Sequence, residues 1–366
     1  MEITLFRAVF AFALSFALIR LLKPISRKLH LVDIPNERKH HENAVPLIGG
    51  LVIYLTLISV EMLFFTATMN LSPYYISAGF LTFVGVLDDR YDLSVKARVA
   101  CTFLATGLMM YWGGQMFTNL GDLIGVGDIV LPVFLAVPFT LIACFGIINA
   151  TNMMDGIDGL SSGLCVLSLT SILIALNFQT ELLEVILCFI GAILAFQIYN
   201  LQLHHRFQKV FLGDAGSMLL GFTLIMMICY YSQSTATRGP RFEAVTGLFL
   251  VGLPLIDMIA TVFRRVHKGK NPFKPDRTHA HHIFMHAGFN QKQTLLILLL
   301  ISALINGIGI LLHYSGSPAW LQFIIFFVVF ITYYKGIKHS FRLSHYLQKV
   351  RGKRAETGAV SQPNNH

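Results

Sequence analysis

Charged residues are scarce in this 366-residue chain. They make up only 13% of it, whereas 55% of the residues are hydrophobic and the mean hydropathy is +0.64. Soluble domains typically contain about 25% charged residues, so the composition excludes an ordinary soluble protein and indicates a membrane protein. Because an ionisable group inside a membrane is costly, the positions of the few charges should carry most of the functional information.

Paired cysteines are also lacking. The five cysteines stand singly in apolar runs, with no Cys-x-x-Cys pair, at Cys101, Cys144, Cys165, Cys188 and Cys229. This spacing predicts neither a disulfide framework nor a thiolate metal site. A signal peptide is not favoured either, because most basic residues near the first apolar run follow it rather than precede it. We interpret that run as a retained span with its N-terminus outside.

Long apolar segments predict an all-α, polytopic membrane protein. Segments of about 20 mostly apolar residues can cross a bilayer, and eleven occur, at roughly 3–22, 46–66, 74–88, 97–117, 128–148, 160–178, 182–201, 213–231, 244–264, 294–313 and 318–337. The fourth and fifth are interrupted by Gly113-Gly114, Pro132 and Pro138. We expect one multi-span catalytic domain over 1–338 and a basic cytoplasmic tail over 339–366, because no repeat or Pro-rich linker marks a separate domain.

The basic residues predict the orientation of these spans. If the N-terminus is periplasmic and the C-terminus cytoplasmic, 25 of the 28 Lys and Arg residues fall on the inner side. This asymmetry is typical of the positive-inside rule. Topology and contact with anionic inner-membrane lipids therefore account for the net charge of +9, which does not indicate nucleic-acid binding.

Aspartates gather in several segments of the predicted inner face. Asp88-Asp89 end the third span, Asp155 and Asp158 lie in the Gly-containing segment 149–159, and Asp214 opens the eighth span. Ionised carboxylates that lie close together need a cation or a basic neighbour. Segment 149–159 has no Lys or Arg, so we predict a cation or substrate site there. The carboxylate of Asp214 suits Mg²⁺, and the glycines beside it suit phosphate. A solvated turn at Asp88-Asp89 and a helix N-cap at Asp214 are the alternatives.

Histidines cluster in the longest inner loop. His279, His281 and His282 follow Asp276 and Arg277. Their spacing is not that of a structural zinc site, and imidazole beside arginine also suits phosphate or sugar hydroxyls, so we favour substrate contact over zinc. Together with the aspartates, the cluster predicts phosphoryl transfer between a soluble nucleotide and a membrane lipid.

Four motifs in this order resemble those of the polyprenyl-phosphate N-acetylhexosamine-1-phosphate transferases. They are Asp88-Asp89, Asn152-x-x-Asp155-Gly-x-Asp158-Gly159, Phe211-x-Gly213-Asp214-x-Gly216-Ser217 and His279-x-His281-His282. Family members that transfer phospho-MurNAc-pentapeptide have an uninterrupted His-His-His and tend to have Lys where this chain has Glu42. Ala280 and Glu42 therefore favour a smaller sugar.

The resemblance implies transfer of GlcNAc-1-phosphate from UDP-GlcNAc to undecaprenyl phosphate, with release of UMP and a requirement for Mg²⁺ or Mn²⁺. It places the chain in the bacterial inner membrane, at the first membrane step of O-antigen and enterobacterial common antigen (lipopolysaccharide) synthesis. Another UDP-sugar is the first alternative. A secondary transporter is the second, although transporters usually place ionisable groups near mid-membrane. The sequence is compatible with a homodimer.

The resemblance also implies a role for each matching residue. Asp88 and Asp89 would be the catalytic pair facing the lipid phosphate, and Asp214 the principal metal ligand with Asn152 nearby. The nucleotide and diphosphate would contact Asp155, Asp158 and Phe211, and the sugar and phosphate would contact Arg265, His279, His281 and His282. Because a phosphate monoester has a second pKa of about 6, the lipid hardly needs a general base, and we expect the catalytic pair to act mainly by positioning.

Overall fold

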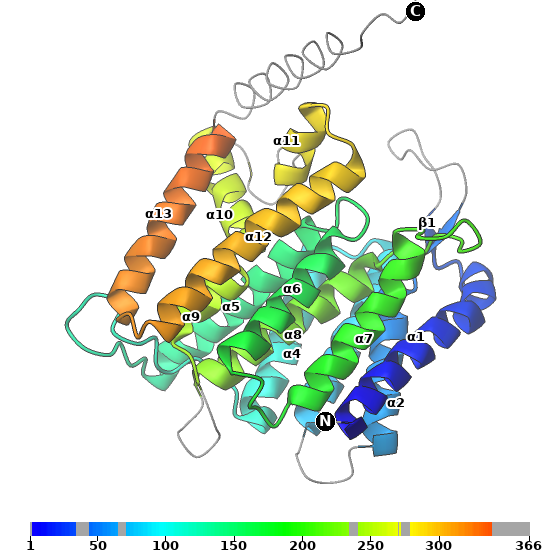
Figure 1. Cartoon of the computed structure of the whole chain (residues 1–366), viewed down its shortest axis with the longest axis horizontal. Helices are drawn as coiled ribbons and strands as arrows, with labels where there is room; N and C mark the ends of the chain where they lie inside the picture. The colour runs from blue at the N-terminus through cyan, green and yellow to red at the C-terminus, as the bar shows by residue number, and fades with distance from the viewer. Residues whose placement is uncertain are drawn as a thin grey trace, which may run out of the picture.

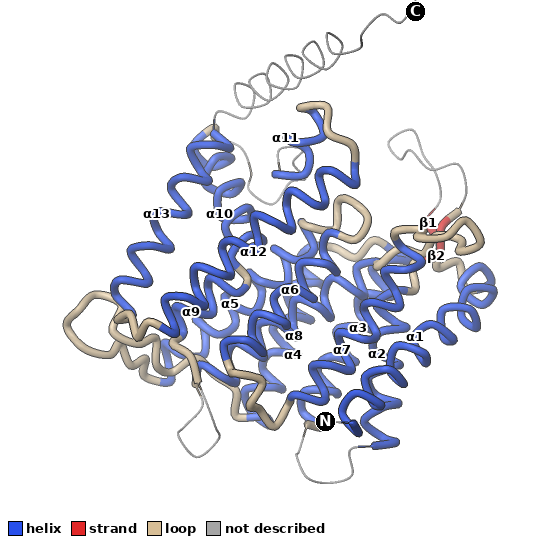
Figure 2. Tube along the Cα trace, viewed as in Figure 1, coloured by secondary structure: helices blue, strands red, loops and turns tan. Residues whose placement is uncertain are grey.

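The computed structural model describes residues 2–33, 44–64, 71–233, 241–269, 271 and 279–338, and almost every element in them is a helix (Figures 1 and 2). The helices are α1 (Glu2–Lys28), α2 (Gly49–Phe64), α3 (Ser72–Tyr91), α4 (Val95–Gly113), α5 (Val133–Met153), α6 (Leu160–Ala175), α7 (Leu183–Asn200), α8 (Gly213–Ser232), α9 (Ala244–Leu250), α10 (Gly252–His267), α11 (Ala280–His286), α12 (Gln291–Tyr314) and α13 (Ala319–Lys338). One antiparallel pair, β1 (Val32–Asp33) with β2 (Val45–Pro46), completes the described elements.

A helix occupies each of the eleven apolar segments, the ninth as two helices, α9 and α10, that meet at 85°. Six helices are long and apolar enough to cross a membrane, namely α1, α5, α7, α8, α12 and α13, and the bent pair can count as a seventh span. An all-α membrane protein is therefore confirmed. The eleven-span topology and the sides of the two termini stay predictions, and the tail over 339–366 lies outside the described residues.

Two predicted boundaries move for local reasons. α4 stops at Gly113 because Gly114 adopts a left-handed conformation, with φ of 65°, as its C-cap. α5 begins after Pro132 and runs on to Met153. Asn152 is therefore helical, whereas Asp155 and Asp158 lie in the turn between α5 and α6.

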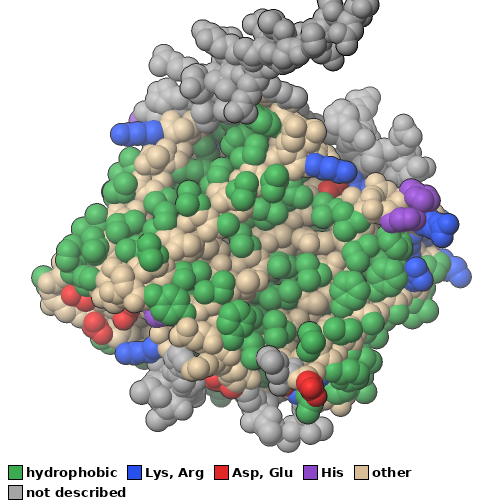
Figure 3. Space-filling view, in the orientation of Figure 1, with side chains coloured by type: hydrophobic (Ala, Val, Ile, Leu, Met, Phe, Trp, Pro, Cys, Tyr) green, Lys and Arg blue, Asp and Glu red, His purple; other side chains and the backbone are tan. Residues whose placement is uncertain are grey.

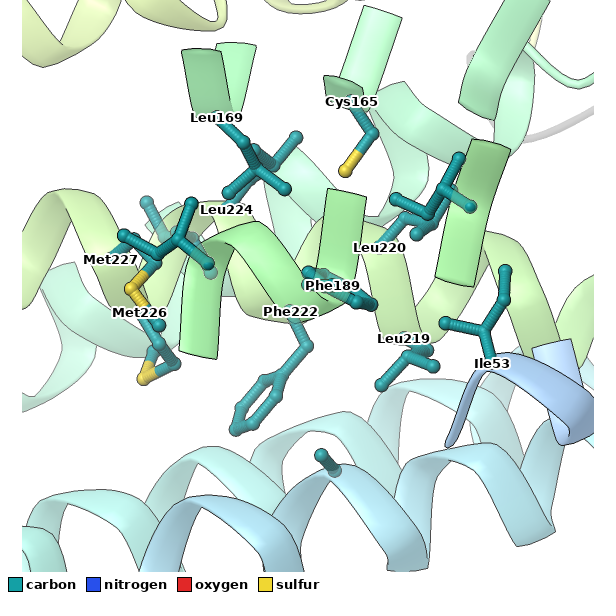
Figure 4. Packing of buried hydrophobic residues seen from close by; sticks show 14 of the residues in the cluster. Ile53, Cys165, Leu169, Phe189, Leu219, Leu220, Phe222, Leu224, Met226 and Met227 are labelled. Atoms are coloured by element: carbon teal, nitrogen blue, oxygen red, sulfur yellow. The ribbon is translucent and has the colours of Figure 1, made fainter. Parts of the chain in front are cut away.

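α8 lies at the centre of the bundle, packed against α2, α3, α5 and α6. Its apolar side chains are almost wholly buried, and Figure 4 shows Leu219, Leu220 and Phe222 within this core. Small residues allow the closest approaches: Gly85 of α3 touches the backbone of Ala215, and Gly50 of α2 touches Gly216. The first turn of α8 is thus fixed between two neighbouring helices.

The outer helices expose apolar side chains. α1, α12 and α13 carry many of the exposed large hydrophobic residues, among them Phe6, Leu300 and Phe327. In Figure 3 hydrophobic side chains cover the middle of the visible face, and charged side chains lie mainly toward its edges. This distribution suits a surface surrounded by lipid.

Candidate active site

A carboxylate from α3 holds the N-terminus of α8. Asp89 accepts hydrogen bonds from the backbone amides of Asp214 at 2.8 Å and Ala215 at 3.3 Å. The first amides of a helix lack internal partners and carry partial positive charge, so this contact stabilises both groups. Gly213 has φ of 74°, and a Cβ there would lie 2.5 Å from Asp89 Oδ2. The sequence left open that Asp214 caps the N-terminus of α8. In the structure, Asp89 of α3 provides that cap instead.

Asp214 is held from its other side by α5. The Asn152 side-chain amide donates to Asp214 Oδ1 at 2.5 Å and to Ser217 Oγ at 2.9 Å. Among the described residues, Asp214 Oδ2 has no hydrogen-bond partner. One carboxylate oxygen thus positions the side chain, and the other is available to a ligand.

Asp88 forms an ion pair with α4. Its Oδ2 accepts from Arg98 at 3.1 Å, its Oδ1 accepts from the amide of Leu93 at 2.7 Å, and its side chain is 2% exposed. Arg90, the other basic residue near this turn, lies with its guanidinium carbon 5.0 Å from the ring centroid of Tyr91. Both oxygens of Asp88 and both of Asp89 therefore already accept hydrogen bonds, which favours positioning over general-base catalysis.

These groups border a small cavity of about 40 Å³ between α3, α4, α5 and α8. Its lining residues are Asp88, Val95, Arg98, Thr102, Phe145, Ile148, Asn149, Asn152, Asp214 and Met218. The cavity combines carboxylates and one guanidinium with an apolar wall. Such a lining suits a phosphate group that carries an apolar chain.

Asp158 has a basic partner that its own segment lacks. Lys209 Nζ lies 2.6 Å from Asp158 Oδ2 and 5.0 Å from the ring centroid of Phe211. The inference that the carboxylates of segment 149–159 have no basic partner is therefore wrong for Asp158. Lys209 comes from the loop after α7, and the only sequence signal for it is its closeness to Phe211.

Asp155 lies where several carboxylates meet. Its side chain remains accessible to solvent, but the protein atoms crowded around it, together with the carboxylates of Asp214, Asp89 and Asp158, raise its pKa well above the ordinary value. Among the described residues, no basic side chain forms an ion pair with Asp155 or Asp214. The site therefore has an excess of negative charge that a cation would neutralise.

The donor set fits a magnesium ion that is completed by substrate. Within the described ranges, no three His, Cys, Asp or Glu side chains converge as a full metal site. Mg²⁺, however, commonly uses one or two protein carboxylates together with water and substrate phosphates. Asp214 Oδ2 and the negative charge around Asp155 match that pattern. In this structure Asn152 donates through its side-chain nitrogen to Asp214 and Ser217.

A buried aspartate organises the histidine cluster. Asp257 of α10 is fully buried, and its Oδ2 lies 2.6 Å from His279 Nδ1. Its Oδ1 accepts from the amide of Ala280 at 3.0 Å and from the Tyr333 hydroxyl at 2.6 Å. Asp257 therefore supports His279 and the start of α11, and Tyr333 is a further partner from α13.

The histidine cluster meets the loop that carries Asp155 and Asp158. The His281 ring packs against Gly156, where any side chain would collide with it, and lies 4.2 Å, centroid to centroid, from the His282 ring. Burial, together with His282 and His279, lowers the pKa of His281 to about 3, so its imidazole is neutral at physiological pH. Among the described residues, its Nδ1 is buried without a hydrogen-bond partner, which suits a substrate contact.

Most predicted site residues thus come together. The aspartates and Asn152 surround the start of α8, Lys209 connects Phe211 to Asp158, and His281 joins through Gly156. Arg265 is buried on α10, and its Nε donates to the carbonyl of Asn271 at 2.8 Å. Glu42, Asp276 and Arg277 lie outside the described residues.

Comparison with known proteins defines the class. Residues 71–232 match the model of the glycosyl transferase family 4, and the chain belongs to this family of sugar-phosphate transferases. It is 37% identical to a protein of Escherichia coli K12 over 90% of this chain and 89% of that one. It is 35% identical to a Salmonella typhimurium protein over 96% of this chain and 93% of that one. It is 34% identical to a Haemophilus influenzae protein over 92% of this chain and 95% of that one.

All three relatives are named undecaprenyl-phosphate alpha-N-acetylglucosaminyl 1-phosphate transferase. They support the transferase interpretation and give no support to the transporter alternative.

Proposed function

We propose that the chain transfers GlcNAc-1-phosphate from UDP-GlcNAc to undecaprenyl phosphate in the bacterial inner membrane. The observation that carries this proposal is the cavity in which Asp88, Arg98 and Asp214 adjoin an apolar wall at the ends of membrane helices. Relatives covering about nine tenths of the chain carry the name of this activity. The surplus of basic residues on one side supports a site that faces the cytoplasm.

In the proposed reaction, the lipid phosphate lies beside Arg98 and its first isoprene units lie along the apolar wall. An oxygen of the lipid phosphate attacks the phosphorus that carries GlcNAc, and the bond from that phosphorus to UMP breaks. Undecaprenyl-diphosphate-GlcNAc and UMP result. The attacking phosphate is mostly dianionic at neutral pH, so one displacement needs no aspartyl-phosphate intermediate.

Each group on the protein has a defined task in this scheme. Asp89 orients the first turn of α8, and Asp88 orients Arg98. Asp214 would hold the Mg²⁺, with Asp155 and Asn152 beside it, and the ion would supply positive charge against the repulsion between two anionic substrates. His281 packs against Gly156 of the 155–158 loop, and with its neighbours His279 and His282 it would contact the sugar and diphosphate.

A transfer assay tests the proposal directly. Membranes or purified protein receive undecaprenyl phosphate, Mg²⁺ and UDP-GlcNAc labelled in the sugar, and the label that enters the organic phase is counted. We expect lipid-linked label that depends on both the acceptor and the metal. Parallel incubations with UDP-GalNAc and UDP-MurNAc-pentapeptide identify the donor. Label in the organic phase with either of these but not with UDP-GlcNAc would contradict the assigned sugar.

A further inference from the structure

A second pocket opens where α1 and α7 end. It is an open pocket of about 380 Å³ and is lined by Arg20, Lys23, Tyr199, His204, Arg206 and Phe207. None of these residues lines the cavity beside Asp214. We propose that this pocket binds the phosphate headgroup of an anionic phospholipid, a role independent of the transfer reaction.

The floor of the pocket is aromatic and tightly packed. The rings of Phe16, Tyr199 and Phe207 contact one another, with centroid separations between 5.0 and 5.6 Å. Tyr199 is only 2% exposed. This packing fixes the half-buried ring of Phe207, which lines the pocket, as an apolar surface against which the glycerol and upper acyl carbons of a lipid can pack.

Cationic groups surround this floor. The lining includes two arginines and one lysine and contains no acidic residue. The Nε of Arg20 donates to the Tyr199 hydroxyl at 3.1 Å, and its guanidinium carbon lies 4.7 Å from the ring centroid of Phe16. These contacts orient the guanidinium and leave its two terminal nitrogens for a phosphate, which guanidinium binds in a bidentate manner.

His204 adds a directed donor. Its Nδ1 accepts a hydrogen bond from the backbone amide of Arg206 at 3.2 Å, so the neutral ring carries its proton on Nε2. The same turn places the Arg206 side chain on the pocket wall. In Figure 3, His and Lys or Arg side chains gather at the right edge of the molecule, where Figure 1 shows the end of α1.

The position favours a lipid over a soluble phosphate. α1 and α7 are both candidate membrane spans, and the pocket lies at their C-terminal ends, where the chain leaves the bilayer. It lies on the same side as the active site, because Asn200, next to Tyr199, bonds to Gly159 and Val210. Basic pockets between membrane helices at this depth bind anionic headgroups.

Native mass spectrometry of the full chain in detergent tests the proposal. Phosphatidylglycerol and phosphatidylcholine with identical acyl chains are titrated separately. We expect selective binding of phosphatidylglycerol by the wild type. One basic residue near an anionic headgroup contributes about fivefold to binding, so Arg20→Gln with Arg206→Gln should weaken phosphatidylglycerol binding about 25-fold and leave phosphatidylcholine binding unchanged.

The matched control removes the same charge from the same end of α1. Arg27→Gln with Lys28→Gln lies outside the pocket lining and should retain the selectivity. If both double variants lose phosphatidylglycerol binding equally, or if neither loses it, the pocket is not the binding site. If the Arg20 variant fails to fold, Arg206→Gln alone, on an exposed loop, should still weaken binding about fivefold. Glycerol phosphate that displaces the lipid at equal concentration would instead identify a site for soluble phosphate and overturn the proposal.

Discussion

At the residue scale, the candidate active site contains identical carboxylates with different partners. Asp88 forms an ion pair with Arg98, and Asp158 forms one with Lys209. Asp89 accepts hydrogen bonds from backbone amides of α8. Asp155 and Asp214 have no such compensation among the described residues, and their negative charge is therefore the best suited to a metal ion and a diphosphate.

Asp214→Asn should lower transfer at least about 100-fold and weaken the dependence on Mg²⁺, because the amide loses the charge that a cation requires. Initial rates over a Mg²⁺ titration measure both effects. Asp92→Asn is the matched control, since Asp92 is exposed at the C-cap of α3 and Asn tolerates its left-handed conformation. Near-normal turnover of Asp214→Asn with the usual magnesium requirement would contradict the metal assignment.

Asp257→Asn should lower kcat by roughly 10–100-fold, because an amide cannot accept at both oxygen positions and His279 loses its fixed tautomer. Tyr333→Phe removes one of three donors and should cost about fivefold, as expected for one buried hydrogen bond. Steady-state kinetics separate kcat from KM for UDP-GlcNAc, and thermal melting monitors folding. A lower melting temperature with unchanged kcat would assign Asp257 a purely structural role.

Asp155→Asn should stabilise the metal-free protein at neutral pH. The fold raises the pKa of Asp155, so the folded chain binds that proton more tightly than the unfolded chain does. The stability that this proton gives the wild type is complete below the unfolded pKa of about 4. It is lost as the pH rises through the folded pKa. The variant should melt above the wild type at pH 7.5, and the difference should disappear near pH 4. Equal melting at both values would contradict the charge assignment, and Asp92→Asn again serves as the control.

At the element scale, the site depends on how closely α3 approaches the first turn of α8. A Cβ on Gly85 would collide with the backbone of Ala215 and lie 2.8 Å from the Asp214 carbonyl carbon. Neither helix can shift without moving Asp89 relative to the backbone amides that donate hydrogen bonds to it.

Gly85→Ala should therefore destabilise the protein by about 1–3 kcal/mol and reduce turnover of the folded fraction. Gly107→Ala is the matched control, because Gly107 is also helical and, among the described residues, no atom outside its own helix backbone lies within 4 Å of an added Cβ. That change should stabilise α4 by about 0.5–1 kcal/mol. Melting temperatures and transfer rates of both variants are compared. Equal behaviour of the two would show that the α3–α8 contact is not limiting.

At the scale of the whole molecule, the predicted eleven-span topology would place the active site and the α4–α5 loop on opposite faces of the membrane. Asp128→Cys should therefore react with a membrane-impermeant thiol reagent in cells whose outer membrane is permeabilised, and His205→Cys should react only after the inner membrane is opened. Both side chains are exposed. The wild type gives the background, since four of its cysteines are buried and Cys101 is half-buried. The reverse labelling pattern would invert the predicted orientation.

Much of the fold could be predicted from the sequence, because hydropathy is a local property and a long apolar run in a membrane must satisfy its own backbone by forming a helix. All eleven apolar segments indeed contain helices. The motifs around Asp155 and Asp214 were recognisable for a similar reason, since carboxylates and glycines without nearby bases are unusual in so apolar a chain.

The sequence by itself determined the membrane class and the helical segments, and it predicted the residues that we propose carry the chemistry. Only the tertiary structure decided which of those residues are neutralised and which are left for ligands. Lys209 reaches Asp158, Asp89 caps a helix other than its own, and Tyr333 and His279 meet at Asp257. These partners are far apart in the chain, and their pairing depends on helix packing, which no local pattern of residues specifies.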